Sequence, residues 1–368
     1  MTSERAYWLA WSQISGVGAV TLQRLRERFS SLETAWTATP RELQTVAGIG
    51  NKNLQQILEQ RSRLTPEKVL AEHEANHPPF LTPADADYPR LLLETPTPPA
   101  ILYYRGNINA AEMQGSQPLI SIVGTRSPSD YGRKWTQKIT TALVKHGYTI
   151  VSGLAAGIDA IAHQSCLDAG GRTLAVLGTG LDITYPQDNR QLYPKIEQQG
   201  AIFTEYPIGT KPDRGNFPAR NRIVAGLSRA VIVTEAPEKS GALITAKYAN
   251  EFGRDVYVLP GSLENKNAIG CLGLLNHGAN VILGEGHLLE MLGTMPQLDL
   301  FEETPPPLPD IAPDLKELLS AIAPEPTAFD VIVQTVQKEA NQVSAGLLQL
   351  ELLGLISQAP GMRYQRLR

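Results

Sequence analysis

Positive charge gathers in one segment of the sequence, KPDRGNFPARNR at residues 211–222. Its cations are Lys211, Arg214, Arg220 and Arg222. A single carboxylate, Asp213, opposes them, and Phe217 stands among them with Pro218 after it. Cations follow phosphates while an aromatic ring stacks on an unpaired base, so this composition predicts a surface that binds single-stranded nucleic acid.

Within this segment we expect Arg214 and Arg220 to face solvent and to contact phosphate, together with Asn221. Arg222 precedes the apolar run IVAGLS, which favours a structural role for it. The alternative is that Phe217 belongs to the core and that one arginine forms a buried ion pair. We expect the binding role and this structural role each to be partly correct.

A further cation follows an expected strand in ISIVGTRSPSDYG. This strand ends in Gly124, Thr125, Arg126 and Ser127. Free amides at the start of the next helix attract anions, and an arginine binds a phosphate through two parallel hydrogen bonds. We therefore predict a phosphate contact at Arg126. The alternative is an ordinary strand-to-helix turn with a surface arginine.

A third stretch, EAPEKSGALITAKYA, leads from a strand end into a helix. Its hydrogen-bond donors are Lys239, Ser240, Gly241 and Thr245, which would complete an anion-binding crevice. Glu235 has no nucleophile or base evident beside it. We therefore interpret Glu235 as an acceptor that orients the arginine-rich segment, rather than as a catalytic group.

Two glycine-rich stretches accompany these segments. In SGLAAGIDAIAH, Gly153 and Gly157 would let the backbone approach a ligand, but the spacing is not the GxGxxG of dinucleotide sites. Asp159 and His163 lie four residues apart, and we expect a structural pair that orients the loop rather than an acid/base pair. The glycines of LGTGLDITYP, at residues 178–180, form either a nucleotide-binding loop or a tight turn.

Short apolar runs must position these residues. The runs in LISIVGTRS, TIVSGL, TLAVLGTG, AIFTEY, AVIVTEA and DVYVLPGS are apolar throughout, and helical stretches separate several of them. Such runs indicate strands buried on both faces of a parallel sheet. The sequence therefore predicts a doubly wound α/β fold, in which ligands bind beyond the carboxyl ends of the strands.

We predict four parts along the chain. Residues 1–66 are helical, because apolar residues recur at i, i+3 and i+4. Residues 67–293 form the α/β domain, with a proline-rich connector at its start. Residues 294–314 are an acidic, proline-rich linker, which is stiffened by its prolines. Residues 315–368 read as three helices and a hairpin, which together describe a winged helix.

The two outer domains leave their partners open. The turns GVG and GIG in the first resemble helix-hairpin-helix elements, which contact either phosphates or proteins; their nearest cations are Arg24 and Lys52. In the winged helix, the third helix has no Lys or Arg, whereas Arg363, Arg366 and Arg368 follow in the wing. We expect a protein contact or an auxiliary DNA contact there.

Composition limits the class of protein. The chain has 368 residues and a formal net charge of -4, so a wholly basic nucleic-acid coat is excluded but a local basic patch is not. Its two cysteines, Cys166 and Cys271, fit a reducing compartment. Neither CxxC nor HExxH occurs, and no apolar run approaches the ~20 residues of a membrane span. We expect a cytoplasmic protein without a metal site or membrane contact.

In this order the motifs resemble the DprA/Smf family, DNA processing protein A. The resemblance covers about residues 88–283 and is carried by YPRLLLETPTPPAILYYRGN, SIVGTRSPSDYG, VSGLAAGIDAIAH, VLGTGLDITYP, FPARNRIVAGLS, EAPEKSGALITA, GRDVYVLPGS and HGAN. The flanks look like the SAM-like helix-hairpin-helix and winged-helix domains that many members carry. The resemblance implies an extended Rossmann fold with no cofactor and no catalytic activity.

The resemblance also implies partners and site residues. It implies binding of single-stranded DNA, protection of incoming strands from nucleases, and loading of RecA against single-strand-binding protein in natural transformation. Members form homodimers through the Rossmann domain. The family's G-[ST]-R, FPxRNR and SGxLIT phrases fall on Arg126, on Phe217, Pro218, Arg220, Asn221 and Arg222, and on Ser240, Gly241 and Thr245.

Two positions depart from the family pattern. Ala156 stands where the family often has arginine, and Leu272 stands where asparagine usually follows GC. These departures put one cation and one polar contact of the crevice rim in question. The core of the predicted site is unaffected.

Two other functions compete with this one. A nucleotide-processing Rossmann enzyme, related to phosphoribohydrolases of nucleoside monophosphates, would carry a PGGxGTxxE phrase; here EKSGALITA lacks the double glycine and the glutamate. An adaptor would use its outer domains to bind partners, which the linker permits but does not require.

Overall fold

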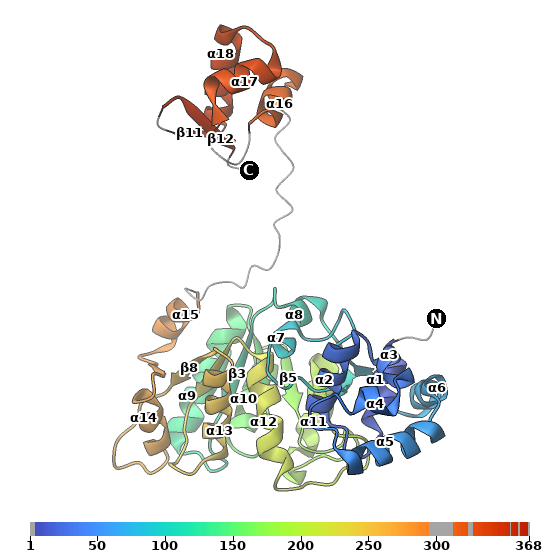
Figure 1. Ribbon diagram of the computed structural model, residues 1–368. Helices are drawn as coiled ribbons and strands as arrows, with labels where there is room; N and C mark the ends of the chain where they lie inside the picture. Colours follow the sequence, from blue (N-terminus) through green and yellow to red (C-terminus); the bar gives the residue numbers. More distant parts are fainter. Residues whose placement is uncertain (1–3, 294–311, 323–326, 354, 360, 367–368) are drawn as a thin grey trace. The chain divides into compact units, whose positions relative to one another are not determined.

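The computed structural model describes residues 4–293, 312–322, 327–353, 355–359 and 361–366 (Figure 1). The chain divides into two compact units, residues 1–296 and 297–368. Residues 294–311 of the predicted linker lie outside the described residues. The predicted boundaries at residues 66, 293 and 314 stay predictions.

A nine-stranded sheet forms the centre of the first unit, in the order β1-β2-β6-β5-β4-β3-β7-β8-β9. Its strands are β1 Phe80–Leu81, β2 Leu102–Gly106, β3 Leu119–Val123, β4 Thr149–Ser152, β5 Thr173–Val176, β6 Ala201–Thr204, β7 Ala230–Val233, β8 Asp255–Val258 and β9 Asn280–Val281. Strands β3 to β9 run parallel to their neighbours among themselves. All six strands predicted from apolar runs are present, so the α/β fold class is confirmed.

The connector before the parallel strands adds two strands that the sequence did not predict. Strand β2 pairs antiparallel with β6, and β1 pairs antiparallel with β2. These two strands extend the sheet toward the N-terminal helices.

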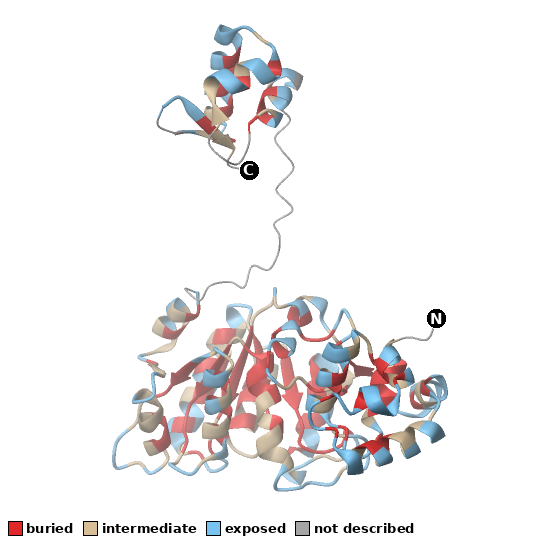
Figure 2. Ribbon diagram, viewed as in Figure 1, coloured by how far each residue is buried: buried red, intermediate tan, exposed pale blue. Residues whose placement is uncertain are grey.

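Helices cover both faces of the sheet, so the strands form the buried layer between them (Figure 2). The helices that pack on one face are α9 Asp130–Lys145, α10 Ile158–Asp168, α11 Leu192–Gln199 and α15 Glu285–Gly293. The other face carries α7 Arg90–Leu93, α8 Ala110–Gln114, α12 Asn216–Leu227, α13 Gly241–Glu251 and α14 Ile269–Leu275. Strand β3 shows the alternation, because Ile120 and Ile122 face the first layer while Leu119 and Val123 face the second.

The order of the strands reverses between β3 and β7. From β3 the chain builds outward through β4, β5 and β6, whereas β7, β8 and β9 extend the sheet in the opposite direction. At such a reversal the two connecting helices leave on opposite faces, which opens a crevice at the carboxyl ends of the strands. The topology therefore places a binding site between β3 and β7.

The N-terminal helices pack against the edge of this sheet. They are α1 Glu4–Ser12, α2 Ala19–Phe29, α3 Leu32–Thr37, α4 Pro40–Leu43, α5 Asn51–Arg63 and α6 Pro66–Asn76. The prediction that this part of the chain is helical is confirmed. The core of these helices, around Trp11 and Leu22, also contains Phe80 and Ile101 of the connector. Arg5 forms an ion pair with Asp85 at 3.4 Å. The helices therefore share one core with the sheet edge.

The second unit is a winged helix, as predicted. It consists of α16 Pro313–Ser320, β10 Thr327–Ala328, α17 Phe329–Val336, α18 Ala340–Leu352, β11 Ile356–Ala359 and β12 Arg363–Arg366, with its sheet in the order β10-β12-β11. Its core includes Leu319, Ile332, Leu347 and Tyr364. In neither unit is a described helix long and apolar enough to cross a membrane.

Candidate functional site

A cavity of about 640 Å³ opens at the carboxyl ends of β3, β4 and β7, where the topology places a site. The predicted residues that line it are Gly124, Thr125, Arg126, Gly153, Arg214, Phe217, Arg220, Asn221, Lys239, Ser240, Gly241 and Thr245. Ser127, Lys211 and Arg222 are not among its lining residues. The fold thus brings four separate sequence motifs into one crevice.

The turn that carries Arg126 is held by Glu235. The Thr125 amide donates to the Glu235 backbone carbonyl at 2.7 Å, and the Ser129 amide donates to its carboxylate at 2.8 Å. Asn265 donates to the same carboxylate at 3.0 Å. Glu235 is an acceptor as predicted, but the segment it orients is this turn and not the arginine-rich one. The reason is topological, because β7 lies beside β3.

The arginine-rich segment is largely helical. From Asn216 it forms helix α12, which lies beside α13. Asn221 donates to the Gly241 carbonyl at 3.1 Å, and the Ser240 side chain caps α13 by accepting from the Ala242 amide at 3.3 Å. The two helices therefore begin together at one wall of the crevice.

The prediction that Arg220 faces solvent is wrong. Its side chain is buried, with 4% of the residue exposed. One guanidinium nitrogen donates to the carbonyls of Gly153, at 2.7 Å, and Val176. Because Gly153 has no side chain, the guanidinium fills the space that a Cβ atom would need. Arg220 thus joins α12 to the ends of β4 and β5.

Arg222 has the structural role that the sequence predicted. Its guanidinium binds the Glu205 carboxylate through two hydrogen bonds of 3.0 and 2.7 Å. This pair ties α12 to the end of β6. The Arg222 side chain is therefore already paired within the protein.

The charge that the crevice offers to a ligand is positive. Arg126, Arg214 and Lys239 are exposed on its lining, and Asp159 is its single carboxylate. Asp159 is buried, and burial lowers the pKa of Arg220 to about 10 against the opposing effect of Asp159. Arg220 still carries its charge near neutral pH. A polyanion therefore meets cations here although the chain is acidic overall.

Asp159 and His163 are structural, but they do not bind each other. Asp159 accepts from the Gly153 amide at 3.1 Å, and burial raises its pKa. His163 is fully buried. The Thr173 hydroxyl donates to the Ile150 carbonyl at 2.9 Å, so it accepts from the His163 Nδ1 at 2.7 Å. Its Nε2 has no hydrogen-bond partner among the described residues. Of the two, only Asp159 lines the crevice, where the Gly153 amide holds its carboxylate.

Because His163 is buried, we expect the protein to lose stability in acid. Burial lowers its pKa to about 3, whereas an imidazole in the unfolded chain titrates near about 6.5. Between these values the unfolded state binds more protons, so the free energy of unfolding falls as pH falls, by up to about 1.4 kcal/mol per pH unit. Urea unfolding of the protein and of His163→Asn at about pH 7 and about pH 5 should show the smaller loss for the variant. Equal losses would contradict this assignment.

Tyr185 lies in the crevice, although it was not among the predicted site residues. It lines the cavity beside Phe217, and the two rings stack at 5.3 Å between centroids with 29° between their planes. The Arg126 guanidinium lies 5.8 Å from the Phe217 ring centroid. The only signal in the sequence was an aromatic residue inside the polar loop LDITYPQD, which follows a strand end. The crevice therefore combines cations with a pair of aromatic rings.

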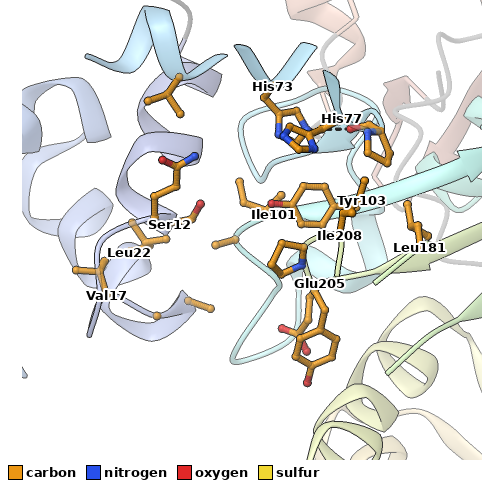
Figure 3. Close-up of a pocket in the computed structure, with 18 of the residues that line it drawn as sticks. Ser12, Val17, Leu22, His73, His77, Ile101, Tyr103, Leu181, Glu205 and Ile208 are labelled. Carbon is orange, nitrogen blue, oxygen red and sulfur yellow. Dashed lines mark hydrogen bonds between the residues drawn. The ribbon is translucent and has the colours of Figure 1, made fainter. Parts of the chain in front are cut away.

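A second cavity, of about 610 Å³, lies between the N-terminal helices and the sheet edge (Figure 3). Val17 and Gly18 of the first Gly-aliphatic-Gly turn line it, opposite Leu181 and Ile208. Its lining has no Lys or Arg, and includes the carboxylates of Glu72 and Glu205. This cavity therefore does not suit a polyanion, and its GVG turn faces the rest of the unit.

Three family models match this chain. The model of DNA recombination-mediator protein A matches residues 79–293, which include every predicted site residue. A SAM-like helix-hairpin-helix tandem matches residues 11–62, and the DprA winged helix domain matches residues 302–362. These matches cover the sheet and both flanking domains.

Relatives match in sequence and in structure. Protein Smf of Synechocystis is 55% identical over an alignment that covers 99% of each chain. The crystal structure of DNA processing protein A from Streptococcus pneumoniae has 33% identity and a TM-score of 0.68, covering 79% of this chain and 98% of that one. The Helicobacter pylori protein, whose structure concerns its single-stranded DNA binding mode, has 32% identity and a TM-score of 0.53, covering 59% of this chain and 96% of that one.

Proposed function

Because this chain belongs to the DNA recombination-mediator protein A family, as its motifs predicted, we propose that its crevice binds single-stranded DNA for delivery to a recombinase. One observation carries the proposal: the exposed guanidinium of Arg126 lies beside the stacked rings of Phe217 and Tyr185. Phosphates and unpaired bases are the two groups that such a site recognises together. A duplex would present the phosphates but hide the faces of its bases.

The phosphate contacts of this proposal come from exposed donors. Arg126, Arg214 and Lys239 supply the positive charge, and the positive end of the α13 helix dipole adds to it. None of these groups reads a base edge in a groove, so binding should tolerate any sequence. Replacement of condensed counterions should make the affinity fall with salt.

We also propose a biological role for this binding. The bound strand would be protected from nucleases and passed to RecA in natural transformation, against competition from single-strand-binding protein. A homodimer of this chain in the cytoplasm would double the footprint and raise avidity. No catalytic step is part of the proposal, because Glu235 and Asp159 already serve as acceptors for backbone and side-chain donors.

The proposal is tested by titrating labelled oligo-dT with the purified protein at two salt concentrations, beside a duplex of equal length. We expect tight, salt-sensitive binding that prefers the single strand. Absence of binding, or equal binding to the duplex, would contradict it. Turnover of a nucleoside monophosphate would favour the nucleotide-processing enzyme instead.

A further inference from the structure

The aromatic ring that the crevice presents to solvent is Tyr185. This residue is 40% exposed, whereas Phe217 is only partly exposed beneath it. Phe217 packs directly on the backbone at Gly178, where an added Cβ would lie 2.8 Å from the ring. With Gly178 and Tyr185 both in contact with it, much of the Phe217 ring surface is already covered. A base that enters the crevice therefore meets Tyr185.

A base does not fit between the two rings. Their centroids lie 5.3 Å apart, whereas a base stacked between them would hold the rings about 7 Å apart, at two contacts of ~3.5 Å each. A nucleobase that uses this pair therefore stacks on its outside. Both residues line the cavity of about 640 Å³, which has room for a base.

The loop that carries Tyr185 is held at several points. The Thr179 hydroxyl donates to the Ile183 carbonyl at 2.9 Å, and the Tyr193 hydroxyl donates to the Leu181 carbonyl at 2.6 Å. After the loop, Asn189 donates to the Leu154 carbonyl at 2.9 Å. A ring that is already positioned loses little conformational entropy when a ligand binds. The loop thus offers a preorganised platform.

We propose that Tyr185 is an outer base-stacking subsite of the crevice. A nucleobase of the bound strand stacks on the exposed face of Tyr185 and extends the column that Phe217 and Tyr185 already form. The neighbouring phosphate binds Arg126, which lies on the Phe217 side of this column. Every base has an apolar face, so the subsite takes any nucleobase. This inference rests on the proposed function and assigns the stacking contact to a residue outside the predicted motifs.

The test separates stacking from charge. Tyr185→Ala should lower the affinity for oligo-dT by roughly 5- to 150-fold, the range of one lost base stack. An abasic oligonucleotide of the same length should bind the variant and the unaltered protein equally. Tyr185→Phe keeps the ring and should bind oligo-dT like the unaltered protein. Equal losses on both oligonucleotides, or no loss on either, would overturn the subsite.

A second measurement uses the unaltered protein, so it does not depend on how a variant folds. A strand containing 5-iodouracil is irradiated in the complex, and the cross-linked peptide is mapped by mass spectrometry. We expect the cross-link at Tyr185. A cross-link at Phe217 alone would show that the inner ring carries the base and would overturn the inference. If the unaltered protein binds no single strand at all, the proposed function itself fails, and that outcome differs from both of the others.

Discussion

Replacing Arg126 with alanine should lower the affinity for oligo-dT by at least about tenfold, because a guanidinium–phosphate contact is a charge-assisted hydrogen bond. Arg126 is exposed in the turn that Glu235 holds, so the change should leave the fold intact. The slope of log affinity against log salt should fall by about one, since one phosphate contact is lost. Fluorescence anisotropy across a salt series measures both quantities.

Arg90→Ala is the matched control for charge. Arg90 is an exposed arginine that begins α7, and α7 packs on α12 near Gly226, far along that helix from its start in the crevice. We expect its affinity and salt slope to match those of the unaltered protein. Equal losses for Arg90→Ala and Arg126→Ala would mean that net charge, and not the crevice, determines binding.

Replacing Arg220 with methionine should lower the free energy of unfolding of the first unit by about 2–4 kcal/mol. The change leaves the buried carbonyls of Gly153 and Val176 without their charged donor. It also removes the positive charge that offsets the buried Asp159 carboxylate. Calorimetry of the full chain measures the loss, and hydrogen exchange should place it at β4 and β5.

Arg214→Met separates stability from binding within the same segment. Arg214 is exposed on the crevice lining, so its replacement should weaken oligo-dT binding without changing the unfolding temperature. Arg220→Met should lower the unfolding temperature. At temperatures where this variant stays folded, its affinity for oligo-dT should be unchanged. An Arg220→Met protein of unchanged stability and reduced affinity would restore the solvent-facing role that the sequence alone predicted for Arg220.

Local patterns in the sequence predicted the strands and most of the residues that meet at the crevice. Uniformly apolar runs specify strands that are buried on both faces, and glycine, hydroxyl and charged residues after those runs mark the ends at which a parallel sheet binds ligands. Both properties are local, so they can be read without knowing which strands are neighbours. For the same reason the place of Arg126 on the crevice lining could be predicted from one turn, and its phosphate contact stays a prediction.

Which groups pair with one another depends on the tertiary fold. Arg220 and Arg214 look alike in the sequence, but Arg220 is buried because Gly153 and Val176 come beside it through the order of β4 and β5. Glu235 holds the Arg126 turn because β7 lies beside β3, and the ring of Tyr185 is placed on Phe217 by a loop from another strand. Whether a side chain is buried, and which group it pairs with, depends on contacts between residues far apart in the chain. Local composition does not reveal those contacts.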